Sequence, residues 1–524
     1  MGQPWAKCSS ALYKWPKIAN NAPLSSLERA VSLVHLPQAP FTCKNLIGGK
    51  WTTPLGAPSR EVLSPYTGRV IGHVPLSPKS EVAVAVDGAR NAVEAWRTTP
   101  MKERTQRMFR LRELLEKNLD ELGHSAAAEA GKMFAEGRAG VLKGIEVVEF
   151  ALSIQNLDLG GSLEVSRGVF CEYRREGLGI VAGITPFNFP AMVPMWMFPI
   201  AVVLGNAFIW KPSEKVPITA CRIGELMLEA GFPAGVFSIV HGGKDAVDGI
   251  LDHPEIRAVA FVGSSPIAKY VYERGAQHQK RVLALGAAKN HLIVVPDADV
   301  ELASQGVLDS FTGCGGQRCM AGSVMVAVGE VGHIVNRLVE KASAVEVGPQ
   351  IGAIIDRPAL DRITSAIAQA EDDGAKVIVD GRGKYPTGEA YASGNWIGPT
   401  ILDGVKPGSH AWRHEIFGPV LSIVRVSTLA EAIALEHQSI YGNACSVFTT
   451  SGAVAEYVAS KARAGMIGIN VGVPVPREPF SFGGSQESKF GHGDITGHGG
   501  IEFWSALKKV TRKWQIQSDH NWMS

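Results

Sequence analysis

The chain has 524 residues, of which 45% are hydrophobic and 19% charged. These ordinary globular values exclude a disordered or fibrous chain, and the length suggests roughly two to four compact units. The 52 basic and 50 acidic residues nearly cancel, which argues against nucleic-acid or membrane-surface binding and favours small-molecule substrates. Seven cysteines without paired metal-type spacing predict no metal site and a reducing compartment: the cytoplasm, or the mitochondrial matrix in a eukaryote.

Residues 1–40 predict a tail and linker. The first 27 residues contain three lysines but no arginine and no long apolar run, which argues against a secretory signal and gives a mitochondrial transit peptide only weak support. Ordered structure is expected from about Gly48. Apolar residues then recur at helical spacing over 81–96 and 105–119, so long helices are expected between residues 80 and 150.

From residue 178 the chain alternates short apolar runs with amphipathic ones. The expected strands are 178–184, 207–210, 236–240, 258–262 and 282–285, and the expected helices are 190–204, 217–230, 244–251 and 266–274. This order predicts βαβ units and an open parallel sheet that binds ligands at the carboxyl ends of its strands. Residues 177–210 carry no charge, but four prolines interrupt them, so we interpret them as buried strand and helix rather than as a membrane span.

A second α/β stretch is expected from about 290 to 480, with strands at 291–295 and 446–449. The tail from residue 500 is alternating and rather apolar. It predicts one or more strands, including 501–504, that pair outside the main domains.

Five short motifs follow one another along these elements. They are Thr185-Pro-Phe-Asn-Phe-Pro190, Trp210-Lys-Pro-Ser-Glu214, Phe261-Val-Gly-Ser-Ser265, Gly315-Gly-Gln-Arg-Cys319 and His414-Glu-Ile-Phe-Gly-Pro419. In this order and spacing they resemble the aldehyde dehydrogenase superfamily from about residue 45 to the end. Gly286-Ala-Ala-Lys-Asn-His291 and Phe480-Ser-Phe-Gly-Gly484 are similar to its CoA-acylating methylmalonate-semialdehyde dehydrogenase branch.

The resemblance implies an aldehyde dehydrogenase-like α/β fold, with two open α/β domains and a small β extension. The implied NAD-binding domain comprises 41–164 and 183–290, and the catalytic domain 291–485. Residues 165–182 and 498–517 would form bridging strands whose apolar character predicts a homodimer or homotetramer.

Cys319 is the expected nucleophile, because a thiolate attacks an aldehyde carbon readily once its pKa is lowered. The resemblance implies that the side chain of Asn188 and the backbone N–H of Cys319 stabilise the resulting oxyanion. Such a donor is worth about 2.7–4 kcal/mol in the transition state. Cys314 does not fit the motif and is interpreted as structural.

The resemblance also implies the NAD site. Lys211 and Glu214 would hold the adenine ribose, where a carboxylate favours NAD over NADP by repelling a 2′-phosphate. Gly263 and Ser264 open a helix suited to the pyrophosphate, and Glu415 would bind the nicotinamide ribose. The remaining expected cofactor contacts are Thr185, Pro186, Phe187 and Phe417.

Leu285 marks an informative difference from hydrolytic relatives. The resemblance places there the glutamate that activates water in hydrolytic enzymes, and this chain reads Leu285-Gly-Ala-Ala-Lys289. Water has a pKa of about 15.7 and needs a base, whereas a thiol near about 8.5 ionises readily. The chain is therefore expected to transfer its acyl group to CoA, unless another carboxylate takes the missing base's role.

Three basic residues are expected to bind a substrate carboxylate. Arg318 matches an arginine of the branch, Lys143 stands where the branch has another arginine, and Arg477 lies in a loop expected to line the substrate tunnel. For Arg477 an ordinary surface position is at least as good an interpretation. The implied reaction is oxidation of methylmalonate or malonate semialdehyde, with loss of the carboxylate and formation of propionyl-CoA or acetyl-CoA.

Two other functions stay open from the sequence. One is a CoA-independent aldehyde dehydrogenase that releases a carboxylic acid, against which Leu285 argues. The other is a catalytically silent NAD-binding protein, against which Cys319, Asn188 and Glu415 argue.

Overall fold

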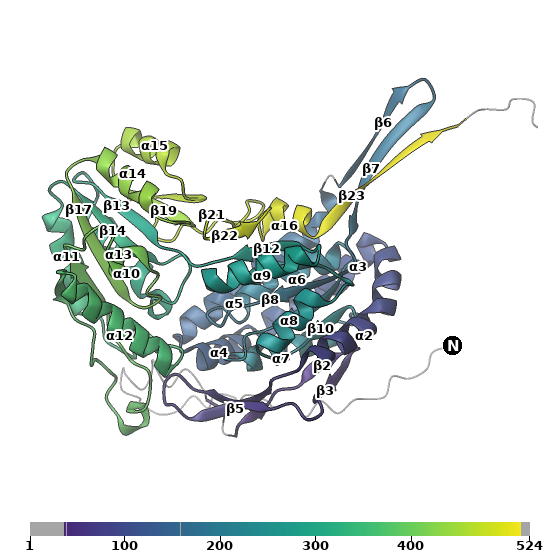
Figure 1. The fold of residues 1–524 in the computed structure, drawn as a ribbon, viewed down its shortest axis with the longest axis horizontal. Helices are drawn as coiled ribbons and strands as arrows, with labels where there is room; N and C mark the ends of the chain where they lie inside the picture. The colour runs from purple at the N-terminus through teal and green to yellow at the C-terminus, as the bar shows by residue number, and fades with distance from the viewer. Residues whose placement is uncertain (1–35, 38, 158, 515–524) are drawn as a thin grey trace, which may run out of the picture.

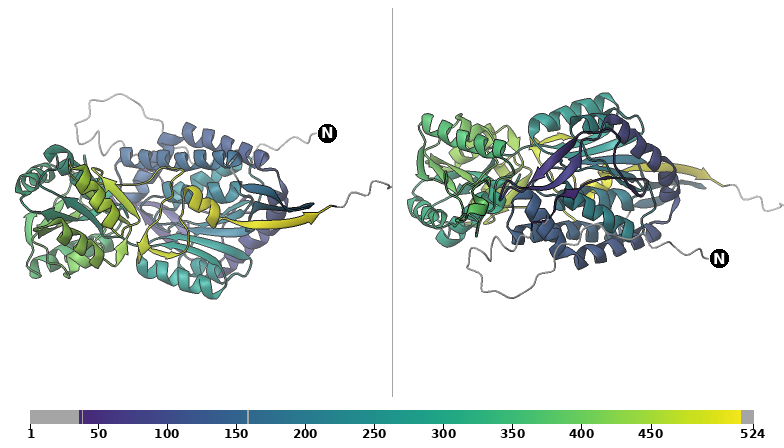
Figure 2. Two further views of the ribbon diagram at one scale, coloured as in Figure 1. Left: turned by 90° about the horizontal axis from the view of Figure 1, so that it is seen from above. Right: turned by 90° about the horizontal axis from the view of Figure 1, so that it is seen from below.

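The computed structural model describes residues 36–37, 39–157 and 159–514. Two α/β lobes lie side by side, and a three-stranded arm projects from one of them (Figures 1 and 2). The predicted tail lies almost wholly outside the described residues. Order begins earlier than expected, because Phe41–Thr42 already form β1.

The first lobe is built on an eight-stranded sheet. Its strands in sheet order are β22 (Lys489–Gly491), β12 (Arg281–Leu285), β11 (Ile256–Val262), β8 (Ile180–Ile184), β9 (Ala207–Lys211), β10 (Phe237–Ile239), β2 (Asn45–Ile47) and β3 (Lys50–Thr52). The strands from β12 to β10 run parallel. The chain leaves β8 through β9 and β10 on one side and returns to β11 and β12 on the other, so the strand order reverses between β8 and β11.

Helices cover this sheet, and each buries one apolar face or more. The crossover helices are α6 (Met192–Val203), α7 (Pro217–Glu229), α8 (Lys244–Asp252) and α9 (Ser265–Gln277), and the N-terminal ones are α2 (Lys79–Thr98), α3 (Met101–Lys117), α4 (Leu119–Ala130) and α5 (Phe134–Ser153). Every residue of α6 is buried, which explains its uncharged sequence. Within the described ranges no helix is both long and apolar enough to cross a membrane.

The second lobe contains a seven-stranded sheet. In order, its strands are β15 (Lys376–Val379), β16 (Thr400–Asp403), β17 (Val420–Val426), β14 (Gly322–Val328), β13 (Asn290–Val294), β19 (Ala444–Phe448) and β20 (Met466–Ile469). All neighbours are parallel except β15 and β16. Its helices are α10 (Val300–Thr312), α11 (Gly332–Ser343), α12 (Arg357–Asp372), α13 (His410–Arg413), α14 (Leu429–Gln438) and α15 (Gly452–Lys461).

Smaller sheets complete the fold. β1 pairs with β5 (Val70–Pro75), which pairs with β4 (Ser59–Leu63), and β18 (Tyr441–Gly442) pairs with β21 (Ser485–Gln486). The arm consists of β6 (Gly160–Ser166), β7 (Val169–Gly177) and β23 (Ser505–Lys513), all antiparallel.

The strand predicted at 501–504 is wrong. Residues Gly497–Phe503 form the helix α16, and only the chain from Ser505 joins the arm. Ile501, Phe503 and Trp504 are all buried, and α16 packs against α6. Apolar residues this close in sequence suit either a strand or one helical turn, and here the tertiary packing selects the helix.

Candidate active site

A tight glycine-rich turn presents Cys319. The short helix Gly313–Gly316 follows α10, and Cys314, Gly315 and Gly316 all have positive φ, of 55°, 62° and 69°. A Cβ at Gly316 would lie 2.1 Å from the carbonyl oxygen of Gly418, so only glycine fits this close approach. The turn therefore requires the glycines that the motif supplies.

Two asparagine amides converge on the backbone of the nucleophile. Asn290 Nδ2 donates to the carbonyl oxygens of Cys319 (2.8 Å) and Ala321 (2.9 Å), and its Oδ1 accepts from the Ala444 N–H. Asn443 Nδ2 donates to the same Cys319 oxygen at 2.9 Å. Sequence reasoning missed both residues. Asn290 begins β13, and Asn443 directly precedes β19. A polar residue at these two positions indicates a shared role only when β13 and β19 are known to be neighbouring strands.

Asn188 reaches the same loop from the other lobe. Its side chain is buried, and Nδ2 donates to the Gln317 carbonyl oxygen at 2.8 Å. Gln317 is itself fixed, because its Oε1 accepts from the Ile355 N–H at 3.0 Å. The structure therefore brings Asn188 within two residues of Cys319, and one of its two amide protons remains for another acceptor.

The surroundings of Cys319 keep its thiol protonated. Burial, followed by the negative charge of Glu415, raises the pKa of Cys319 to about 12. Burial likewise raises the pKa of Glu415 to about 7, against a hydrogen bond from the Ala288 N–H (2.9 Å) and the charge of Lys289. Burial lowers the pKa of Lys289 to about 7. These three groups form a coupled set in which the charge of Glu415 affects the nucleophile.

The two sheets contribute opposite strand ends. Thr185 and Lys211 lie at the carboxyl ends of β8 and β9, whereas Cys319 and Glu415 precede β14 and β17 at amino ends of the second sheet. An ion pair between Lys215 and Asp356 (2.6 Å) joins the lobes beside this site. The predicted rule of carboxyl-end binding thus describes the first lobe only.

Most of the predicted cofactor residues gather at this junction. Thr185, the neighbour of Pro186 in the chain, accepts a hydrogen bond through Oγ1 from Trp210 Nε1 at 2.8 Å. The rings of Phe187 and Phe417 meet edge to face with their centres 5.9 Å apart, so an aromatic residue from each lobe contributes to this contact.

Lys211 and Glu214 form a pair at the end of β9. Lys211 Nζ lies 3.1 Å from Glu214 Oε2. Burial acts against the ionised carboxyl, but the Lys211 ammonium and its hydrogen bond outweigh it and hold the pKa of Glu214 below its usual value. An ionised, part-buried carboxylate at this strand end suits the hydroxyls of a ribose.

The start of α9 fits a pyrophosphate. Ser264 is its N-cap residue in extended conformation, and its side chain makes no capping hydrogen bond. The first backbone N–H groups of α9 are therefore not satisfied by that side chain, and the helix dipole adds positive potential there. Gly263 precedes them at the end of β11, beside β8. These residues fit a dinucleotide that runs across the reversal of strand order.

The three predicted substrate residues differ in what they contact. Arg318 donates to the carbonyl oxygens of Gly313 (2.9 Å) and Asp309 (2.5 Å), so part of its guanidinium caps the end of α10. Lys143 Nζ lies 2.6 Å from a carboxylate oxygen of Glu146 and 4.0 Å from one of Glu478. Two carboxylates therefore already compete for the Lys143 ammonium.

Arg477 is exposed in the loop after β20, beside the part-buried Glu478. Val473 and Val475 of the same loop pack against the hydrophobic cluster that Cys319 also contacts. The loop and the nucleophile thus border the same hydrophobic core, and the role of the loop in lining a substrate tunnel stays a prediction.

The side chain of Leu285 is buried at the end of β12. It belongs to the hydrophobic cluster that Cys319 contacts, and it offers no group able to accept a proton from water. Across the described parts of the chain, no cluster of three or more His, Cys, Asp or Glu side chains could hold a metal ion.

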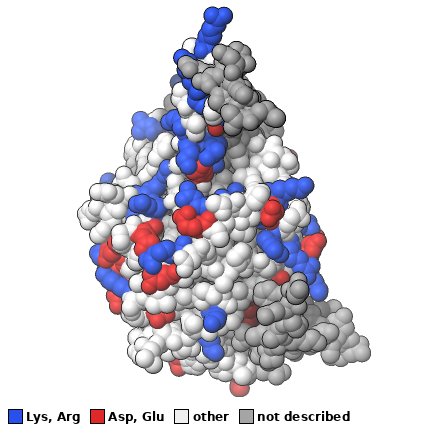
Figure 3. Space-filling view, turned by 90° about the vertical axis from the view of Figure 1, so that its right-hand side faces the viewer, with Lys and Arg blue, Asp and Glu red and all other residues white. Residues whose placement is uncertain are grey.

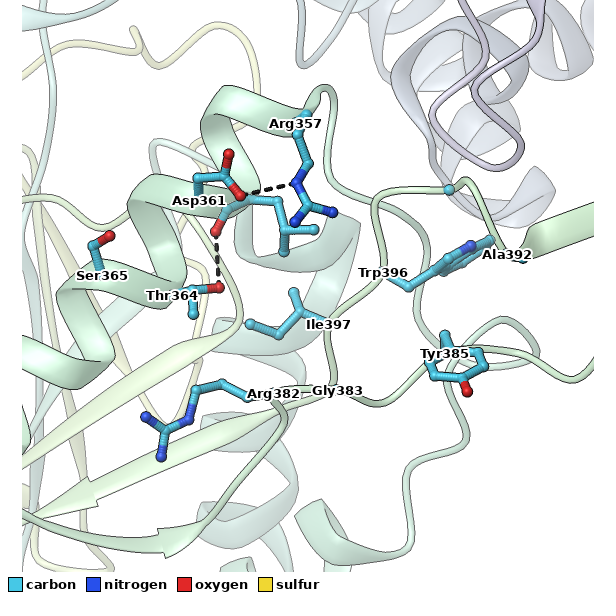
Figure 4. A pocket seen from close by; sticks show the side chains of 12 residues that line it. Arg357, Asp361, Thr364, Ser365, Arg382, Gly383, Tyr385, Ala392, Trp396 and Ile397 are labelled. Carbon is cyan, nitrogen blue, oxygen red and sulfur yellow. Dashed lines mark hydrogen bonds and ion pairs between the residues drawn. The ribbon is translucent and has the colours of Figure 1, made fainter.

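A separate hollow of about 420 Å³ lies between α12 and the loop 382–397 (Figure 4). Arg357 pairs with Asp361 one turn along α12 at 2.9 Å, and Arg382 is held by Asp380 and Glu371. Its guanidinium groups are thus already paired with carboxylates, and none of its lining residues is one predicted for catalysis.

Comparison with known proteins identifies the family. The profile described as "Aldehyde dehydrogenase family" matches residues 51–510, so the chain belongs to the aldehyde dehydrogenase family. It is 42% identical to a malonate-semialdehyde dehydrogenase of Bacillus cereus, over 90% of this chain and 98% of that protein. A malonate-semialdehyde dehydrogenase of Geobacillus kaustophilus is 43% identical over 90% of this chain and 99% of that protein.

Solved structures agree with this assignment. The methylmalonate-semialdehyde dehydrogenase from Oceanimonas doudoroffii is 39% identical and has a TM-score of 0.89. The match covers 91% of this chain and 99% of that one. A Sinorhizobium meliloti protein assigned as a methylmalonate-semialdehyde dehydrogenase, complexed with NAD, is also 39% identical. Its TM-score is 0.89, with 92% of this chain and 99% of that chain covered. The predicted family and fold class are confirmed.

Proposed function

We propose that the protein oxidises a short carboxylated semialdehyde, such as malonate or methylmalonate semialdehyde, with NAD and transfers the acyl group to CoA. Cys319 attacks the aldehyde carbon, and Asn188 donates an N–H to the oxyanion, together with the backbone N–H of Cys319. NAD supplies the hydride acceptor, held by Glu415, Lys211 and Glu214. The family, the names of the relatives and the NAD-bound relative support this assignment.

The Cys319 thiol must lose its proton before it can attack the aldehyde. Burial and the carboxylate of Glu415 raise its pKa, which favours the protonated thiol before ligands bind. Neutralising Glu415, or ordering it on a ribose, would favour the thiolate. The site is therefore expected to become nucleophilic as its ligands assemble, which protects the thiol beforehand.

The single observation that carries the CoA assignment is Leu285, a buried apolar side chain in the hydrophobic cluster that Cys319 contacts. The thioester on Cys319 needs an acceptor for its acyl group, and Leu285 offers no base that could activate water. A thiol ionises without that help, so CoA is the acceptor that fits. If the substrate is a malonate-type semialdehyde, the acyl enzyme bears a β-carboxylate whose loss precedes the transfer.

The test is NADH formation from malonate semialdehyde and NAD, with and without CoA. Turnover that requires CoA and yields acetyl-CoA supports the proposal, and a single burst without CoA places the block at deacylation. Steady turnover without CoA would overturn the assignment of Leu285 and favour release of a carboxylic acid. No NADH from a panel of aldehydes, together with an unaltered phenotype of Cys319→Ala in cells, would favour a catalytically silent protein.

We also propose that the arm joins copies of the chain into a homodimer or homotetramer in the cytoplasm, or in the mitochondrial matrix of a eukaryote. One arm face carries ion pairs, Glu172 with Arg512 (2.6 Å) and Glu176 with Lys508 (2.8 Å). Figure 3 shows Lys and Arg side chains along the projecting arm. The opposite face carries Leu163, Tyr173 and Leu507, which are 69%, 45% and 43% exposed. Light scattering of wild type and Leu163→Asp tests whether this face associates.

A further inference from the structure

A buried group of sulfur and imidazole lies outside the active site. We call Cys43, Cys221 and His241 the thiol cluster. Cys43 connects β1 to β2, Cys221 is in the second turn of α7, and His241 follows β10. They are 1%, 2% and 0% exposed, so three segments far apart in sequence enclose them.

Cys221 is the centre of this cluster. Its Sγ lies 3.5 Å from His241 Nε2, and Cys43 packs in the same small cluster of buried residues. His241 is held in place, because its N–H donates to Asn45 Oδ1 at 2.9 Å and its carbonyl oxygen accepts from the Ser77 N–H. Two thiols therefore share one buried cluster, and one of them contacts an imidazole.

This arrangement favours a thiolate on Cys221. Burial alone would oppose ionisation, but the hydrogen bond from Cys43, the charge and hydrogen bond of His241 and the Lys44 N–H together lower the pKa of Cys221. The pKa of Cys43 is raised by burial and by its bond to Cys221. A thiolate beside a protonated thiol is the usual arrangement of a reactive cysteine pair.

Cys445 shows what an inert buried cysteine looks like in the same chain. It is fully buried, and its thiol makes a long contact of 4.0 Å with the Ser446 carbonyl oxygen. Burial raises its pKa, with a further contribution from Glu436. Burial therefore does not by itself produce the properties of the thiol cluster.

We propose that the thiol cluster is an oxidation site at which peroxides convert Cys43 and Cys221 into a disulfide. The Cys221 thiolate, whose proton has gone to solvent, attacks the peroxide O–O bond and becomes a sulfenic acid, and the departing hydroxide takes up a proton from solvent to form water. Cys43 then attacks the sulfenic sulfur and releases water. In total, two thiols lose two protons and two electrons, and hydrogen peroxide is reduced to two molecules of water.

Access requires local opening, and the structure offers a short segment for it. β1 pairs with β5 through two residue pairs only, Phe41 with Gly72 and Thr42 with His73, directly before Cys43. So short a ladder opens more easily than the core sheets. The disulfide would tie this segment to α7, the helix that follows the Lys211–Glu214 loop.

The experiment uses the full chain carrying Cys319→Ala, so that the nucleophile does not consume peroxide. The protein is treated with hydrogen peroxide, its remaining thiols are alkylated after unfolding, and peptides are mapped by mass spectrometry. We expect a linked Cys43–Cys221 peptide, reversed by dithiothreitol, and loss of Cys221 at least about tenfold faster than loss of Cys445.

Two variants in that background sharpen the result. Cys43→Ser should abolish the linked peptide and leave a Cys221 sulfenic acid that dimedone traps. The matched control Cys445→Ser should form the linked peptide as before. Peroxide that oxidises other cysteines without linking Cys43 to Cys221, or that oxidises Cys221 no faster than Cys445, would overturn the proposal, and neither result depends on the catalytic assignment.

Discussion

Replacing Asn290 should lower the stability of the fold and displace the Cys319 thiol from its position. Its amide makes three hydrogen bonds, to the Cys319 and Ala321 carbonyl oxygens and from the Ala444 N–H. In Asn290→Ala the last two groups lose this partner in a buried setting, at about 1–3 kcal/mol each. The expected loss of stability is therefore about 2–6 kcal/mol.

Asn443→Ala is the matched comparison. Its amide also holds the Cys319 carbonyl oxygen, but that oxygen keeps its bond from Asn290. The expected cost is that of one ordinary hydrogen bond, about 0.5–1.5 kcal/mol, together with the weaker contact to Met320 Sδ at 3.1 Å. The two variants should lose similar amounts of catalytic rate, because both remove a hydrogen bond to the Cys319 carbonyl group. Displacing a reacting atom by 1 Å can lower the rate by about 100-fold.

Urea midpoints measure the stability difference, and single-turnover NADH formation measures the chemical step. We expect a fall of about 10–100-fold in the single-turnover rate of each variant, with little change in KM for NAD. In the double variant the activation free energy of the single turnover should rise by more than the sum of the two single effects, by at least about 0.5 kcal/mol. The reason is that the Cys319 carbonyl oxygen then has neither amide as a partner. Additive effects on the rate, or equal urea midpoints for the two single variants, would refute this account.

Three further predictions concern charge. Glu415→Gln removes a carboxylate that adds to burial in raising the pKa of Cys319, so iodoacetamide alkylation at a fixed pH should become faster; an unchanged pH profile would contradict this. Burial raises the pKa of Glu129 to about 8 from 4.5, so folding favours its protonated form and wild-type stability should fall as pH rises from about 4.5 to about 8. Glu129→Gln should flatten urea midpoints over that window, and parallel curves would disprove the link. Arg477→Gln should lower kcat/KM for malonate semialdehyde by about 10–100-fold and spare propanal, because a charged hydrogen bond is worth about 1.5–3 kcal/mol. Lys143→Met should cost less, since two carboxylates already engage that ammonium, and equal losses would speak against this reasoning.

The meeting of strand ends explains why the site lies between the lobes. A single parallel sheet presents loops at its carboxyl ends, and the first lobe follows that rule with Thr185 and Lys211. The second lobe turns its amino ends to the same place, which brings Cys319 and Glu415 opposite them. The nucleophile and the expected cofactor residues thus sit on separate frameworks, joined by contacts such as the Lys215–Asp356 ion pair.

The sequence by itself determined the elements and the local chemistry. Alternation of apolar runs predicted β8 to β12 and their helices to within a few residues, because buried parallel strands and amphipathic helices leave periodic patterns. The motifs around Asn188 and Cys319 identified the family, because close backbone approach at Gly316 and a thiol nucleophile tolerate few alternatives. These are properties of short segments, which a sequence expresses directly.

Only the tertiary structure decided which distant groups meet. Asn290 and Asn443 both reach the Cys319 carbonyl oxygen because β13 and β19 are neighbours. Cys43 packs with Cys221 because β2 lies beside β10, which α7 covers. Residues 501–503 became helical through packing on α6, against their local pattern. Such contacts depend on strand order and packing between segments far apart in the chain, and no local pattern encodes them.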